Sequence, residues 1–145
     1  MSDAPPLAVR GVHHVGVLVR DARATAARLA ALGLRVRAWE EYGPGELRIA
    51  FIPVGETLIE LIEPLTDQGW NAEWLRTHGE GVQHVALAVD DLAAALAALR
   101  ARGVALADEA PRRGAGNTLI AFLRDPAGGV LVELTQPLGP PPWAA

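Results

Sequence analysis

The sequence predicts an α+β fold built from two tandem βαβββ modules that pair to enclose a cleft. The first observation behind this prediction is a duplication. The pentapeptide that starts at Gly11 returns at Gly81, and 11 of the 23 positions aligned from Gly11 to Gly33 are identical. The second is that each copy reads as a strand, a helix and three further strands. Because a unit of this size cannot bury its apolar face alone, we expect the two copies to share a core.

The first module, residues 9–64, opens with an apolar run and continues with alanines and leucines at helical spacing. Asp21 is expected to cap this helix, and Gly33 is the glycine expected to end it. The predicted elements are the strand Val12–Val19, the helix Ala22–Leu32 and the strands Leu34–Trp39, Glu46–Pro53 and Thr57–Glu63.

The second module, residues 81–137, copies the first after a connector at 65–80. In the connector, Trp70 and Trp74 are four residues apart and fit one face of a helix. The predicted elements of the second module are the strand Val82–Val89, the helix Leu92–Arg102 and the strands Val104–Asp108, Asn117–Arg124 and Gly129–Thr135. Asp91 is expected to cap this helix and Gly103 to end it. The proline-rich tail, residues 138–145, is expected to be ordered only where it contacts the body of the protein or a partner.

Composition narrows the function classes. Half of the 145 residues are hydrophobic, which allows a sizeable core, and the net charge of −4 gives no reason to expect nucleic-acid binding. The chain has no cysteine, so a metal site must use nitrogen and oxygen ligands. No apolar run reaches membrane-spanning length. We therefore expect a soluble cytoplasmic protein.

Four polar residues recur at equivalent positions of the two modules. His14 and His84 lie in the opening strands, whereas Glu60 and Glu133 lie in the closing strands. Strand alternation places small residues on the histidine face, and this leaves room for a ligand. We expect all four side chains to point into the cleft.

These four side chains have the chemistry of a divalent-metal site. A buried carboxylate without a partner is unfavourable by several kcal/mol, and two neutral imidazoles with two carboxylates suit a divalent cation. The alternative for any one residue is a satisfied core histidine or a surface glutamate. Repetition at symmetry-related positions favours the metal. His13 is expected to point to the face opposite that of His14; its counterpart is Gln83, and it is interpreted as structural or as a residue that supports a metal ligand. His78 is interpreted as solvent-exposed.

The chain resembles the vicinal oxygen chelate superfamily over residues 9–137, and within it the methylmalonyl-CoA epimerase family. The segments that carry the resemblance are Val12–Val17, Arg48–Gly55, Ile59–Pro64, Gly79–Ala86 and Gly128–Leu134. The resemblance implies paired βαβββ modules around a metal-containing cleft. It also implies that His14, Glu60, His84 and Glu133 hold a cobalt, nickel, manganese or zinc ion.

The chemistry that this resemblance implies is removal of a proton next to a carbonyl, with methylmalonyl-CoA or a similar acyl-CoA as substrate. Glu133 is the candidate for one acid/base group. Epimerases of this family carry a second glutamate just before the strand that contains Arg48. The aligned residue here is Pro44, so Glu46, two residues later, is the candidate, and Glu41 lies further away.

Two other functions remain open at this stage. A glyoxalase-I-like lyase or isomerase acting on thiol hemithioacetals uses the same four-ligand pattern. A non-catalytic small-molecule-binding resistance protein of the same fold typically lacks the ligands. Arg112 and Arg113 are candidates for binding the phosphates of CoA, although an adjacent arginine pair is more often a solvated turn. The resemblance also implies a homodimer.

Overall fold

The computed structural model describes residues 7–144. Its elements, in chain order, are β1 (Val9–Leu18), α1 (Ala22–Ala30), β2 (Ala38–Tyr42), β3 (Leu47–Val54), β4 (Thr57–Pro64), α2 (Trp70–His78), β5 (Gly81–Val89), α3 (Leu92–Ala101), β6 (Arg112–Gly114), β7 (Thr118–Phe122) and β8 (Leu131–Pro137). The order βαβββ occurs twice, with α2 in the connector. The predicted α+β class with tandem βαβββ modules is confirmed.

The described chain forms two compact units. The N-terminal unit comprises His14–Gln83 together with residues 142–144. The C-terminal unit comprises His84–Pro141 together with residues 7–13. Each unit contains one helix of the repeated pattern and one set of paired strands.

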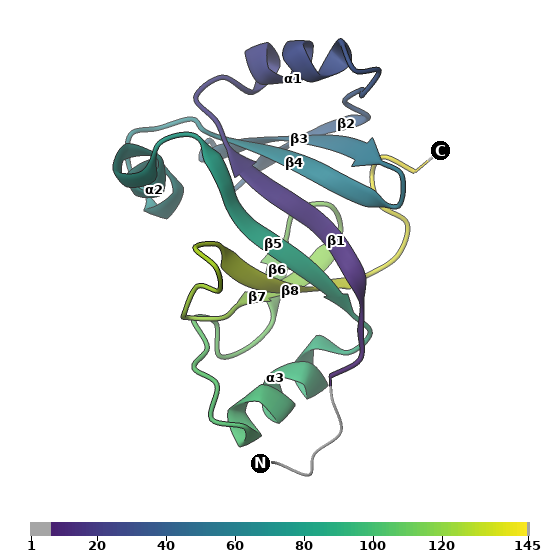
Figure 1. The fold of residues 1–145 in the computed structure, drawn as a ribbon, viewed down its shortest axis with the longest axis vertical. Coiled ribbons are helices and arrows are strands. Elements are labelled where there is room, and N and C mark those ends of the chain that lie inside the picture. Colours follow the sequence, from purple (N-terminus) through teal and green to yellow (C-terminus); the bar gives the residue numbers. More distant parts are fainter. Residues whose placement is uncertain (1–6, 145) are drawn as a thin grey trace. The chain divides into compact units, whose positions relative to one another are not determined.

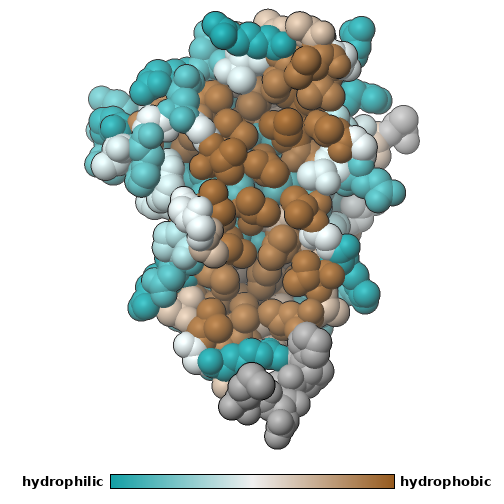
Figure 2. Space-filling model, in the orientation of Figure 1, coloured by the Kyte–Doolittle hydropathy of each residue, from teal (hydrophilic) through white to brown (hydrophobic). Residues whose placement is uncertain are grey.

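In the N-terminal unit the strands are ordered β2-β3-β4-β1, and β1 runs parallel to β4. Figure 1 shows α1 lying across β3 and β4. Beneath the helix, Ala22 packs with Ala50, Ile52 and Leu61 in a buried apolar cluster. On the face drawn in Figure 2, apolar side chains gather over the strands of this unit, whereas α2 is mainly hydrophilic. One face of the sheet is thus occupied by the helix, and the opposite face is available for a site.

The C-terminal unit repeats this arrangement. Its strands are ordered β5-β8-β7-β6, and β5 runs parallel to β8. Helix α3 is more apolar than α1, and Leu92, Leu96 and Leu99 are buried in a cluster that includes Ala121 and Leu134. A helix therefore covers the equivalent sheet face in both units.

The helix boundaries follow the sequence signals. Asp21 accepts a hydrogen bond from the Ala24 amide and Asp91 accepts one from the Ala94 amide, each at 3.0 Å. Gly33 and Gly103 follow the helices with φ of +83° and +76°, a conformation that favours glycine. Both predicted N-caps and both predicted terminating glycines are in place.

Two predicted strands are misplaced, for the same physical reason. The strand expected at Leu34–Trp39 is observed at Ala38–Tyr42, and the one expected at Val104–Asp108 is observed at Arg112–Gly114. The alternating apolar side chains in both predicted segments pack against the core clusters under the helices; they are Leu34 and Val36, and Val104 and Leu106. The alternation therefore reflects burial of these side chains, while the paired strand begins later in the chain.

Among the helices of residues 7–144, none has the length and apolar character needed to span a membrane.

Candidate metal centre

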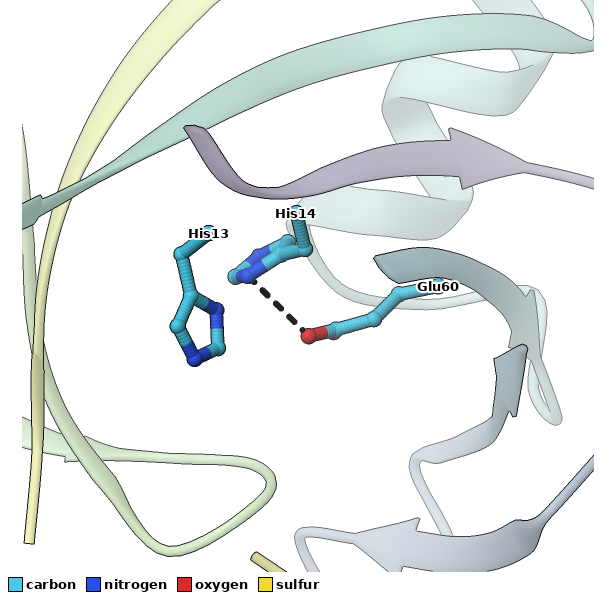
Figure 3. A group of neighbouring side chains, drawn as sticks. All are labelled: His13, His14 and Glu60. Atoms are coloured by element: carbon cyan, nitrogen blue, oxygen red, sulfur yellow. Dashed lines mark ion pairs between the residues drawn. The ribbon is translucent and has the colours of Figure 1, made fainter. Parts of the chain in front are cut away.

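A buried histidine–glutamate pair lies on the helix-free face of the N-terminal unit. Gly16 of β1 is in register with Glu60 of β4, so His14, two residues earlier in β1, shares the face of Glu60. The His14 Nδ1 and Glu60 Oε2 atoms are 3.2 Å apart (Figure 3), and neither residue is more than 4% exposed. The parallel pairing of β1 with β4 thus brings together two residues that are 46 positions apart.

His13 lies beside this pair, contrary to the expectation from strand alternation. One ligand atom from each of His13, His14 and Glu60 lies within 4.8 Å of the others (Figure 3). The pairing of β1 with β4 starts only at His14, so the β4 ladder does not fix the direction of the His13 side chain. His13 is half-buried, and its ring nitrogens are potential metal donors.

The C-terminal unit contains the equivalent pair. Ala86 of β5 is in register with Glu133 of β8, and the His84 Nε2 and Glu133 Oε2 atoms are 3.8 Å apart. Both residues are 3% exposed. The Thr135 hydroxyl donates a hydrogen bond of 3.0 Å to Glu133 Oε2, and this contact orients the carboxylate.

Each glutamate has a phenylalanine directly across from it on the neighbouring strand. Phe51 of β3 is opposite Glu60, and Phe122 of β7 is opposite Glu133. The Phe122 ring meets the His84 ring edge to face at a centroid distance of 5.3 Å. The apolar rings limit water around the carboxylates, and this strengthens electrostatic interactions at both pairs.

The donor chemistry and spacing of both pairs fit a divalent ion. Ligands about 2.1 Å from one ion in tetrahedral geometry lie about 3.4 Å from each other. The observed nitrogen–oxygen separations of 3.2 and 3.8 Å lie on either side of this value.

A further glutamate, which the sequence reasoning missed, lies on the same sheet face. Glu40 of β2 is in register with Ile49 of β3, two residues from Phe51, and alternation therefore puts Glu40 on the face of Glu60. Glu40 is half-buried. The misplaced β2 explains the omission, because the predicted strand ended at Trp39 and left Glu40 in a loop.

The residues expected from sequence to serve as the second base and the phosphate site are exposed. Glu46 lies in the turn between β2 and β3, where its amide donates to the Gly43 carbonyl. Arg112 and Arg113 are in β6, and the Arg112 guanidinium bonds Asp108 and lies 5.9 Å from the centre of the Phe122 ring. Arg112 is therefore close to the aromatic ring that flanks His84.

The glyoxalase/bleomycin resistance protein/dioxygenase superfamily model matches residues 13–122. The chain belongs to this superfamily. The resemblance inferred from the sequence, to the same superfamily under its vicinal oxygen chelate name, is confirmed. The matched region includes the first histidine–glutamate pair and His84 but ends before Glu133.

Individual members of the superfamily match almost the whole chain. The uncharacterized protein YqjC of Bacillus subtilis is 36% identical over 130 residues, covering 87% of this chain and 91% of that protein. The ethylmalonyl-CoA/methylmalonyl-CoA epimerase of Cereibacter sphaeroides is 32% identical over 129 residues, covering 86% and 96%. The crystal structure of methylmalonyl-CoA epimerase from Mycobacterium tuberculosis superposes with a TM-score of 0.85 at 34% identity, covering 94% and 93%.

Proposed function

We propose that this superfamily member is a divalent-metal-dependent epimerase or isomerase that removes a proton next to the carbonyl of an acyl-CoA thioester. The names of two relatives support methylmalonyl-CoA or a similar acyl-CoA as the substrate. The observation that carries the proposal is the repetition of a buried histidine–glutamate pair, once in each unit. A protein that only bound an apolar molecule would gain nothing from two buried carboxylates.

In this proposal His14, Glu60, His84 and Glu133 together hold one cobalt, nickel, manganese or zinc ion. When bound, such an ion polarises a substrate carbonyl and favours loss of the neighbouring proton. The protein contributes two neutral imidazole donors and two carboxylates from parallel strand pairs, which fixes the donors on rigid elements. The apolar rings of Phe51 and Phe122 keep these donors away from bulk water.

Glu133 is the proposed acid/base group on one side of the substrate. Its Oε2 atom accepts a hydrogen bond from the Thr135 hydroxyl, and this orients the carboxylate that would exchange a proton with the substrate. Epimerisation needs a second group that returns a proton to the opposite face. Glu40 and Glu46 compete for this role. The position of Glu40 on the Glu60 face favours Glu40, whereas Glu46 would have to reach the site from an exposed turn.

Proton exchange with solvent tests the function directly. Racemic methylmalonyl-CoA and ethylmalonyl-CoA are incubated in D₂O with the metal-loaded protein, and loss of the α-proton signal is followed by NMR. We expect exchange that depends on the added metal and that disappears in the Glu133→Gln variant. His78→Ala, which changes an exposed histidine outside both pairs, is the matched control. Absence of exchange with both thioesters would overturn the proposal.

The same preparation discriminates the alternative within the superfamily. The hemithioacetal of methylglyoxal and glutathione is supplied as substrate, and formation of the corresponding thioester is measured. Turnover of the hemithioacetal without exchange of the acyl-CoA α-proton would assign a glyoxalase-I-like activity. The homodimer and the cytoplasmic location stay predictions, and light scattering of the purified protein measures the oligomeric state.

A further inference from the structure

The C-terminal tail places an aromatic ring against the phenylalanine that stands opposite Glu60. The Trp143 and Phe51 ring centroids are 4.8 Å apart, and the ring planes are inclined by 30°. Phe51 has no exposed surface, whereas Trp143 is half-buried. Trp143 therefore covers the Phe51 ring and itself presents surface on this side of the sheet.

The strand register shows which side that is. Phe51 is directly opposite Glu60 in the antiparallel pairing of β3 with β4, and directly opposed residues project from the same face of a sheet. Glu60 in turn faces His14. Trp143 consequently lies on the face that carries the histidine–glutamate pair, away from the face that α1 covers.

The chain before Trp143 is stiff. Pro140, Pro141 and Pro142 precede it, and each proline ring fixes its own φ. The Asn117 side-chain amide donates a hydrogen bond to the Pro140 carbonyl at 3.3 Å. Such a segment loses little conformational entropy when its last ring packs. The tail is thus suited to hold Trp143 in one place.

The second repeat surrounds the equivalent ring with other side chains. Phe122 occupies the position of Phe51, but its ring packs against His84 and under the Arg112 guanidinium. The tail tryptophan therefore introduces an asymmetry into a duplicated site. Coverage of Phe51 for stability alone would also explain the contact, and the experiment must separate the two roles.

We propose that Trp143 forms an apolar wall beside Glu60 and limits the size of the substituent on the α-carbon of the substrate. This inference rests on the proposed function. A ligand held at Glu60 meets the Trp143 ring, because Trp143 covers Phe51. A bulky indole at this place leaves room for a small alkyl group and excludes longer ones.

Substrate preference is the first test. The kcat/KM values for methylmalonyl-CoA, ethylmalonyl-CoA and butylmalonyl-CoA are compared in the wild type, Trp143→Phe and Trp143→Ala. Because one methylene group in an apolar pocket changes specificity by about tenfold or more, we expect Trp143→Ala to raise the butyl-to-methyl ratio by at least about tenfold, with Trp143→Phe in between. An unchanged ratio in a folded, active Trp143→Ala protein overturns the proposal, because a purely stabilising ring would not alter it.

Trp39→Ala is the matched control. Trp39 also lies in this unit, but it is opposite Ala50 in the ladder and is exposed on the other face of the sheet. The substrate ratio of this variant is expected to equal that of the wild type. A similar change of the ratio in Trp39→Ala would show that loss of any tryptophan loosens the site, and it would overturn the specific role of Trp143.

A second readout is independent of turnover. In a protein whose other tryptophans, Trp39, Trp70 and Trp74, are replaced by phenylalanine, Trp143 is the only indole, and binding of Co²⁺ alone is expected to quench its emission. Equilibrium dialysis of the same protein measures whether Co²⁺ binds.

Bound Co²⁺ without quenching overturns the placement of Trp143 and leaves the metal site intact. No bound Co²⁺ overturns the metal site of the proposed function, and the present inference falls with it. Quenching without any thioester turnover supports the placement and overturns the epimerase activity.

Discussion

At the scale of single residues, the proposed function depends on the four repeated donors. Each histidine meets the glutamate of its own module across a parallel strand pair, at 3.2 Å in one unit and 3.8 Å in the other. Whether the two pairs hold one ion or two is a question of stoichiometry.

The first prediction concerns that stoichiometry. We expect one Co²⁺ or Zn²⁺ per chain, and we expect either His14→Ala or His84→Ala to remove it, because each histidine is a ligand of the same ion. Loss of a group that only supports a ligand costs about 10–100-fold in affinity, so loss of a ligand should weaken binding by roughly 100-fold or more. Equilibrium dialysis with elemental analysis measures both quantities.

His78→Ala should bind the metal like the wild type, since His78 lies at the end of α2 and its ring stacks on Trp74. Two ions per chain in the wild type, with one lost in each variant, would show that the two pairs are separate sites. That result would contradict the four-ligand proposal.

The second prediction separates the candidates for the second base. We expect Glu40→Gln to lower kcat by about 10²–10⁴-fold, the usual contribution of a positioned acid or base, and Glu46→Gln to lower it less. Glu41→Gln is the matched control, because Glu41 is on the same strand but faces the other way. Steady-state kinetics on methylmalonyl-CoA measures the three effects. A larger loss in Glu46→Gln than in Glu40→Gln would assign the base to the turn.

At the scale of elements, the duplication extends to how each helix is started. Besides the aspartate caps, a side chain from the end of the last strand accepts the first helical amide in both units. Glu63 accepts from the Ala22 amide and Gln136 from the Leu92 amide, each at 2.8 Å. A glutamate and a glutamine thus perform the same structural task.

The third prediction follows from these caps. We expect Asp91→Ala to lower the free energy of unfolding by about 0.5–2 kcal/mol, as is usual when an N-cap is lost, and Asp21→Ala to have an effect of similar size. Urea denaturation followed by circular dichroism measures the change. Glu56→Ala, an exposed residue in the turn after β3, should be neutral. Equal losses for the cap variants and the control would indicate that the observed Asp–amide bonds contribute nothing to stability.

At the scale of the whole molecule, the proposed metal site would link metal binding to folding. The proposed donors lie on β1, β4, β5 and β8, and each histidine meets the glutamate of its own unit only through strand pairing in the folded chain. A metal that binds the folded state alone stabilises it by RT ln(1 + [L]/Kd), which is about 2.7 kcal/mol at 100 times Kd.

The fourth prediction is therefore a rise in the midpoint of thermal unfolding when metal is added, reversed by EDTA. The double variant His14→Ala/His84→Ala should unfold at a temperature that does not respond to metal, whereas His78→Ala should respond as the wild type does. Differential scanning calorimetry measures the shift. A metal-dependent rise that persists in the double variant would place the ion elsewhere.

The order of elements, the helix caps and the four candidate donors could be predicted from the sequence alone. Each of these features depends on a local sequence pattern, and the same pattern occurs in both repeats. The prediction for one repeat therefore supports the prediction for the other. The alternation of β1 was enough to place His14 on the face with Gly16, and the same pattern placed His84. Neither the periodicity nor the duplication requires knowledge of which strands pair.

Features that depend on pairing between distant segments became visible only in the folded structure. The true start of β2 put Glu40 on the face of Glu60, and the packing of Leu34 under α1 explains why the alternation there was misleading. The contact of Trp143 with Phe51 joins residues 92 positions apart. Neither the position of Glu40 nor the contact of Trp143 can be predicted from a local pattern. The register of a strand and the docking of a tail depend on the surfaces that they contact.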